Sequence, residues 1–195
     1  MTRRRRTPGD WRGARSRGIA RDREAARLVL CYGAFGFGYI IPATFLPVMA
    51  KQVIQDPAVF GWSWPVFGAA AMGSTLATTM LRSVVSNRRL WIASHLLMAF
   101  GVALPVVWSG IAAIMIAALF VGGTFMVITM VGMQEARDVA GTHATGLMAA
   151  LTPAFALGQI VGPVIVSYVV AASGSFSVAL MIASAVLVVS AYELS

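Results

Sequence analysis

The sequence predicts an all-α membrane protein with six transmembrane helices. The chain of 195 residues is 58% hydrophobic and has a mean hydropathy of +0.80. Charge, glycine and proline also divide it into six apolar segments, and a helix needs about 18 to 25 such residues to cross roughly 30 Å of hydrocarbon. The expected spans are 28–50, 61–81, 90–109, 111–133, 145–170 and 176–191.

The amino-terminal tail, residues 1–27, carries ten of the 15 Lys and Arg residues. It has too few apolar residues to fold alone, so we expect a disordered tail or a short helix that leads into the membrane. The chain then divides into this basic cytoplasmic tail and a six-helix transmembrane bundle over residues 28–192. Anionic membrane lipid is the expected partner of the tail; nucleic acid is not, because no aromatic residues interleave with the arginines.

The remaining basic residues predict the orientation. With the amino terminus inside, the inner loops hold Arg82, Arg88, Arg89 and Arg137, whereas the outer loops hold only Lys51. Basic loops resist translocation. Both termini are therefore expected on the cytoplasmic side of a membrane, which we expect to be a bacterial inner membrane. A tight hairpin at residues 108–110 separates the third span from the fourth.

The six spans resemble two triplets with one pattern. The first and fourth are rich in Gly, Thr and aromatic or Met residues, the second and fifth in small residues, and the third and sixth in aliphatic residues. Many transporters consist of three-helix units related by inversion. The pattern predicts two inverted three-helix repeats, in which successive helices face a cavity, a neighbouring helix and lipid.

The stretch YGAFGFGYIIPATFLP, residues 32–47, indicates a cavity wall that can bend. Helical spacing places Tyr32, Phe35 and Tyr39 on one face, and Pro42 and Pro47 release backbone groups that must be satisfied away from lipid. The alternative is that glycine and proline here only permit tight packing. The candidates for the wall of a substrate cavity are Tyr32, Phe35, Tyr39, Thr44, Phe125, Thr129 and Gln159.

Two further sets of residues are candidates for packing and gating. Gly158 and Gly162 form a GxxxG pair followed by Pro163, a pattern that lets helices approach closely; Gln159 between them serves either a substrate contact or an interhelical hydrogen bond. Charged residues at the inner ends could form a gate or could be solvated helix ends. These gate candidates are Arg82, Arg88, Arg89, Glu135 and Arg137.

The other titratable residues argue against an enzyme and against a metal-binding protein. His95 is the only ionisable residue well inside a span; a structural hydrogen bond is expected for it before proton handling, in a helix that the repeat pattern places away from the cavity. Cys31 is expected to be a small apolar residue. One Cys and two distant histidines, His95 and His143, do not suit a metal site. A serine protease would need a base that the last three spans lack. We expect no enzyme and no cofactor.

Several motifs together carry a resemblance to a known family. They are YGAFGFGYIIPATFLPVMA, GWSWPVFGAA, RRLW, GGTFMVITMVGMQEAR and FALGQIVGP, in this order. Over about residues 29–192, the chain resembles the carboxy-terminal six helices of YbfB/YjiJ-type transporters of the major facilitator superfamily. SNRR, residues 86–89, resembles a degenerate copy of the superfamily's signature loop without its Gly-x-x-x-Asp opening. GQIVGP, residues 158–163, resembles the glycine-proline motif of antiporter members.

The resemblance implies a transporter of twelve helices in two bundles, with a substrate site at the midplane between them. Such transporters work by alternating access, and this chain supplies one bundle for the secondary transport of a small organic solute. A second six-helix half, either its own missing amino-terminal half or a partner chain, is then expected. The alternative is a six-helix membrane scaffold that does not transport.

Overall fold

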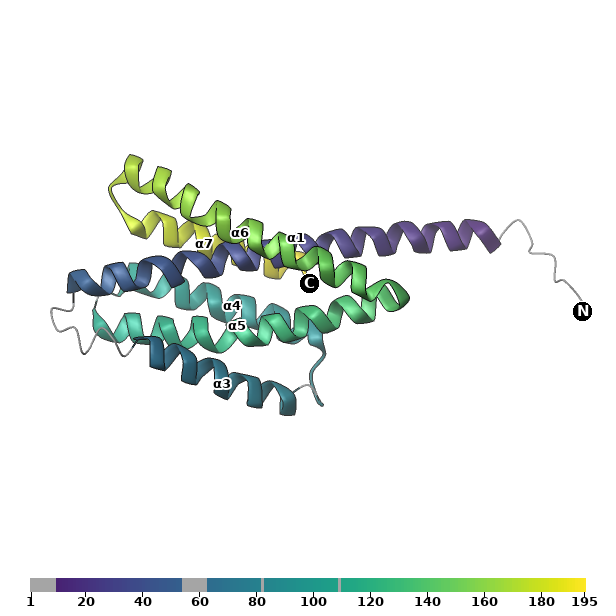
Figure 1. Cartoon of the computed structure of the whole chain (residues 1–195), viewed down its shortest axis with the longest axis horizontal. Helices are drawn as coiled ribbons and strands as arrows, with labels where there is room; N and C mark the ends of the chain where they lie inside the picture. The colour runs from purple at the N-terminus through teal and green to yellow at the C-terminus, as the bar shows by residue number, and fades with distance from the viewer. Residues whose placement is uncertain (1–9, 54–62, 82, 109) are drawn as a thin grey trace, which may run out of the picture.

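The computed structural model describes residues 10–53, 63–81, 83–108 and 110–195. Within these ranges the chain is helical and contains no strand (Figure 1). The bounds of the helices are α1 (Asp10–Val53), α3 (Ser63–Leu81), α4 (Asn87–Val107), α5 (Ile111–Ala140), the 3-10 turn η1 (Gly141–His143), α6 (Ala144–Ser173) and α7 (Phe176–Glu193). Apart from the start of α1 and the end of α5, the helices begin and end close to the breaks in hydropathy.

Four stretches of the described chain are long and apolar enough to cross a membrane. They are Arg21–Phe45, Asn87–Val107, Ile111–Ser173 and Phe176–Glu193. The third contains both α5 and α6, joined by η1. An all-helical membrane protein is thereby confirmed. The helix α3 is not among the four stretches, so six separate crossings remain a prediction.

The helix α1 extends well beyond its apolar part. It begins at Asp10 and continues to Val53 without a break, so residues 10–27 of the basic tail are helical rather than disordered; residues 1–9 lie outside the described chain. At 1.5 Å per residue, its 44 residues span about 66 Å, more than a bilayer with its headgroups. In Figure 1 this amino-terminal part projects beyond the other helices.

The helix α5 lies between two sets of helices. It packs on α3 and α4, and also on α1 and α6, while α1 packs on α6 and α7, and α7 on α4. Figure 1 shows α3 and α6 on opposite outer sides of the bundle. The core lies where α1, α4, α5 and α7 meet, and its fully buried residues include Leu28, Trp91, Ile128 and Leu187.

The short connections have identifiable causes. Ser86 caps α4, because its side chain accepts a hydrogen bond from the backbone N–H of Arg89, as favoured residues at helix starts do. Gly110, between α4 and α5, has a φ of 127°, a value that side chains disfavour. The hairpin predicted at residues 108–110 therefore turns at its glycine, although Ser109 itself is outside the described residues.

Candidate functional site

Six aromatic side chains from four helices form a continuous cluster, which we call the aromatic cluster. Its closest rings are those of Tyr39 and Phe125, whose centroids are 4.4 Å apart. Phe35 lies 5.0 Å from Phe155 and 5.6 Å from Phe125, measured between centroids. Such offset and tilted rings are the arrangement that aromatic quadrupoles favour. The members are Tyr32, Phe35 and Tyr39 of α1, Phe67 of α3, Phe125 of α5 and Phe155 of α6.

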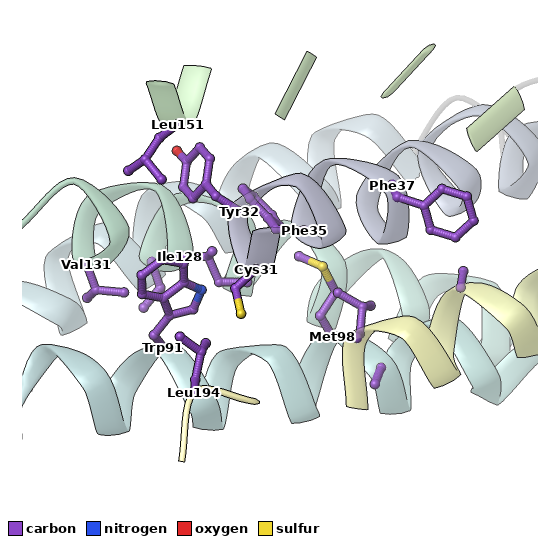
Figure 2. Close-up of a cluster of buried hydrophobic side chains, with 14 of the residues drawn as sticks. Cys31, Tyr32, Phe35, Phe37, Trp91, Met98, Ile128, Val131, Leu151 and Leu194 are labelled. Carbon is purple, nitrogen blue, oxygen red and sulfur yellow. The ribbon is translucent and has the colours of Figure 1, made fainter. Parts of the chain in front are cut away.

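The aromatic cluster has a buried part and a half-exposed edge. Tyr32 is 3% exposed and Phe35 is 0% exposed, and Figure 2 shows both among core side chains that include Trp91. The other four rings are half-buried. Sequence spacing predicted one wall of Tyr32, Phe35 and Tyr39, but α1 has neighbours on several sides. The first two rings therefore support the cluster from within, and only Tyr39 reaches its edge.

The remaining cavity candidates lie on α1, α5 and α6. Thr129 is half-buried, and its hydroxyl donates a hydrogen bond to the backbone oxygen of Phe125, 2.9 Å away on the same helix. Thr44 is exposed on α1 and Gln159 is half-buried on α6. Sequence reasoning missed Phe67 and Phe155. Phe155 lies three residues before Gly158. A glycine at a close helix crossing indicates that side chains near it on the same helix contact the partner helix, so Gly158 was a signal for Phe155.

The glycines of α6 cross α1 at backbone contact. A Cβ atom placed on Gly158 would overlap the backbone oxygen of Gly33 and would lie 2.7 Å from the backbone nitrogen of Phe37. A Cβ on Gly162 would lie 2.5 Å from Cγ2 of Ile40. Small residues permit such approach between membrane helices. The GxxxG pair thus faces α1.

The facing glycines of α1 complete the crossing. A Cβ atom on Gly36 would overlap the backbone oxygen of Phe155, so the crossing also brings Phe155 against Phe35. Pro163 is half-buried inside α6, which continues through it to Ser173. The two helices are held at one fixed separation by backbone rather than by adjustable side chains.

Charged side chains from four helices meet at the end of the bundle that the sequence analysis expects on the inner side, and we call them the inner charge cluster. Arg88 of α4 pairs with Glu24 of α1 and, at 3.1 Å between Nε and Oε1, with Glu135 of α5. Arg27 of α1 lies 3.3 Å from Glu24 and 3.9 Å from Glu193 of α7. Arg88, Glu24 and Glu135 are only 13–25% exposed in their side chains. Partial burial strengthens such pairs relative to fully exposed ones.

The gate candidates separate into two groups. Arg88 and Glu135 come together in the inner charge cluster, whereas Arg89 and Arg137 are exposed and form no ion pair within the described ranges. Arg82 lies outside those ranges. Nearby, the amide nitrogen of Asn87 donates to a carboxylate oxygen of Asp138 at 3.2 Å, which adds a second link between α4 and α5.

Sequence reasoning missed three members of this cluster: Glu24, Arg27 and Glu193. The signal for the first two was their spacing of three residues, which pairs side chains along a helix. It was not used because the sequence did not distinguish a disordered tail from a short helix that leads into the membrane. Glu193 gave no signal beyond its place in the last turn of α7.

His95 lies in the core and does not face lipid. It is 0% exposed, its ring packs 6.3 Å from that of Phe35 between centroids, and Nδ1 lies 3.3 Å from the backbone oxygen of Trp91. Its Nε2 has no hydrogen-bond partner in the described part of the chain. Cys31 is also buried, and its thiol donates weakly to the backbone oxygen of Ser190 at 3.7 Å.

Comparison with known proteins returns one family for the chain. The family model described as "Uncharacterised MFS-type transporter YbfB" matches residues 5–194. The match contains the aromatic cluster, the helix crossing and the inner charge cluster. No curated protein matches the chain.

Proposed function

The chain belongs to the YbfB-type family of major facilitator superfamily transporters, and we propose that it carries a small organic solute across the membrane by secondary transport. The observation that carries this proposal is the family match over residues 5–194. We propose further that α1, α3, α4, α5, α6 and α7 each cross the membrane once. Both termini would then lie on the cytoplasmic side of a bacterial inner membrane, as the distribution of Arg favours.

The half-exposed edge of the aromatic cluster is the proposed solute contact. Its rings, Tyr39, Phe67, Phe125 and Phe155, come from α1, α3, α5 and α6. These are the helices that the repeat pattern assigns to cavity and helix contact; α4 and α7 contribute none. Aromatic surface with a few polar groups suits many organic solutes.

A second six-helix bundle is the proposed partner of this edge. Substrate sites of secondary transporters lie at the interface between repeats near the midplane, and alternating access follows when one bundle rocks against the other. Gln159 and Thr44, which are half-buried and exposed respectively, would supply polar contacts to solute or partner. Tyr32 and Phe35 would position the cluster from behind.

The two groups of inner charges receive different roles. The inner charge cluster fastens α1, α4, α5 and α7 to one another, because its ion pairs join residues of these four helices. Arg89 and Arg137 are exposed and would face the second bundle. They are therefore the stronger candidates for charges that make or break contacts when the inner side opens.

Solute levels in cells that express the chain test the transport proposal. Untargeted mass spectrometry would compare the unaltered chain, Tyr39→Ala and the matched control Tyr168→Ala, whose tyrosine is 76% exposed on α6. We expect at least one organic solute to change with expression, to return to the vector level in Tyr39→Ala and to stay changed in Tyr168→Ala. A chain present in the membrane with no changed solute would contradict transport and favour the scaffold alternative.

The intact mass of the natural product tests the proposed second bundle. The protein would be extracted gently from its own membranes with an antibody against its last residues. A subunit near 20.6 kDa that copurifies with a second membrane protein or a second copy supports a partner chain, and a subunit about twice as large supports both bundles in one chain. A monomer near 20.6 kDa alone in the membrane would contradict the second bundle.

A further inference from the structure

A cavity of about 310 Å³ lies among α3, α4 and α5, apart from the aromatic cluster. Its volume is at the lower end of the range of small-molecule pockets. Leucines from three helices supply much of its apolar surface, namely Leu81, Leu90, Leu97 and Leu119. No aromatic-cluster residue and no charged residue lines it among those described. The cavity therefore favours a neutral occupant that is mostly apolar.

Three buried hydroxyl groups reach this cavity, one from each helix. Thr78 is 3% exposed, and Ser94 and Thr124 are each 5% exposed. The hydroxyl of Thr78 donates to the backbone oxygen of Ser74 at 2.6 Å, and that of Thr124 donates to the backbone oxygen of Phe120 at 2.7 Å. Since each threonine has used its only proton, both can offer only acceptor lone pairs to an occupant.

Ser94 differs from the two threonines. Its side chain forms no hydrogen bond with any residue in the described ranges, although nearly all buried polar groups in proteins have a partner. Its hydroxyl can both donate and accept. A buried serine without a partner on the wall of a cavity points to a ligand atom that supplies one.

The α5 wall of the cavity is open at a glycine. A Cβ atom added to Gly123 would meet no atom within 4 Å, in contrast to Gly122, where it would lie 2.6 Å from the backbone oxygen of Phe67. The neighbouring glycine thus serves helix packing, whereas Gly123 leaves space in the cavity. A larger side chain at this position would occupy the cavity without disturbing a helix contact.

We propose that this cavity binds a neutral amphipathic alcohol, with its hydroxyl at Ser94 and its apolar body against the leucines. A hydroxyl group can accept a hydrogen bond from Ser94 and donate one to Thr78 or Thr124. This matches the donor and the acceptors that the wall presents. A lipid acyl chain would match the leucines but would leave Ser94 unpaired, which is costly in a buried setting. The proposal does not depend on the transport function, because the site lies within one bundle.

A diazirine-bearing octanol is the probe for this site. The purified full-length chain in detergent would be irradiated with it, and labelled peptides would be quantified by mass spectrometry. A diazirine-bearing octane serves as the comparison probe without a hydroxyl. We expect octanol to label residues 90–97 and 119–127, and unlabelled octanol to suppress this labelling.

Three variants decide the outcome. Ser94→Ala should lower octanol labelling of these peptides about two- to tenfold, the effect of one lost hydrogen bond, and should leave octane labelling unchanged. Gly123→Leu should abolish labelling there, whereas Gly68→Leu, at another open glycine outside the cavity, should not. The proposal is overturned by equal octanol labelling in Ser94→Ala and the unaltered chain, or by octane labelling as strong as that of octanol. If Gly123→Leu does not fold, Ser94→Ala alone tests the proposal, because this substitution removes only one oxygen atom.

Discussion

Replacing Gly158 with alanine tests the backbone contact between α1 and α6. The new Cβ would overlap the backbone oxygen of Gly33 and lie 2.7 Å from the backbone nitrogen of Phe37. Neither atom belongs to a side chain that could rotate away, so the helices must separate. Overpacking of this kind costs about 1–3 kcal/mol. Alanine is also more favourable than glycine in a helix by about 1 kcal/mol. The control must therefore be a Gly→Ala substitution that gains the same helix propensity.

Gly146→Ala is that control. It lies on the same helix, is exposed, and would place its Cβ in open space, so it gains helix propensity without a clash. For a chain of this size, 1 kcal/mol shifts the unfolding midpoint by roughly 2–4 °C. We therefore expect Gly158→Ala to melt roughly 2–12 °C below Gly146→Ala in detergent, measured by the loss of the monodisperse peak on size-exclusion chromatography after heating.

Equal midpoints for these two variants would refute the backbone contact as the feature that fixes α6 on α1. Gly174, between α6 and α7, is not a suitable control. Its φ is 68°, a conformation that side chains rarely adopt, so a substitution there introduces strain of its own.

Three further substitutions test the inner charge cluster, the aromatic cluster and the buried histidine by thermal stability in detergent. Arg88→Gln should lower the free energy of unfolding by about 1–3 kcal/mol, because it leaves Glu135 unpaired and Glu24 paired with Arg27 alone, while Arg89→Gln should have little effect; similar losses would argue against the cluster. Phe35→Ala should cost about 3–5 kcal/mol through the cavity it leaves, and Phe100→Ala, 53% exposed, much less; the reverse order would contradict the assigned core. His95→Leu should cost no more than about 0.5–1.5 kcal/mol, because it removes the hydrogen bond of Nδ1 with the backbone oxygen of Trp91 and keeps an apolar side chain in the core; a much larger loss would contradict a purely structural role for the ring.

Hydropathy was enough to place the helices. The last span was expected at 176–191 and α7 is Phe176–Glu193; the third was expected at 90–109 and α4 is Asn87–Val107. Lipid imposes these positions, because backbone groups inside hydrocarbon must be paired within the helix. For the tail, composition left open two alternatives, a disordered segment and a short helix, and residues 10–27 are helical. Composition describes a segment in isolation, whereas residues 10–27 continue a helix that is already nucleated at its apolar end.

The sequence predicted only those parts of the candidate site in which a residue type indicates what packs against it. Gly158 implies a close helix, and α1 is that helix. Helical spacing, in contrast, showed that Tyr32, Phe35 and Tyr39 share a face, but it could not show how far along that face neighbouring helices extend. The burial of Tyr32 and Phe35 depends on residues far away in sequence, among them Trp91 and Phe155.

The contacts of α1 determine how the bundle can move. The helix is fixed to α6 by the glycine crossing in its apolar part and to α4 and α7 by Glu24 and Arg27, just before that apolar part. A helix held at two levels, by backbone contact and by paired charges, cannot tilt alone without breaking one of them. Motion that preserves both contacts is motion of the bundle as one body. Under the proposed alternating access by a rocking bundle, the moving contacts would lie outside these two, at the half-exposed aromatic edge and at Arg89 and Arg137.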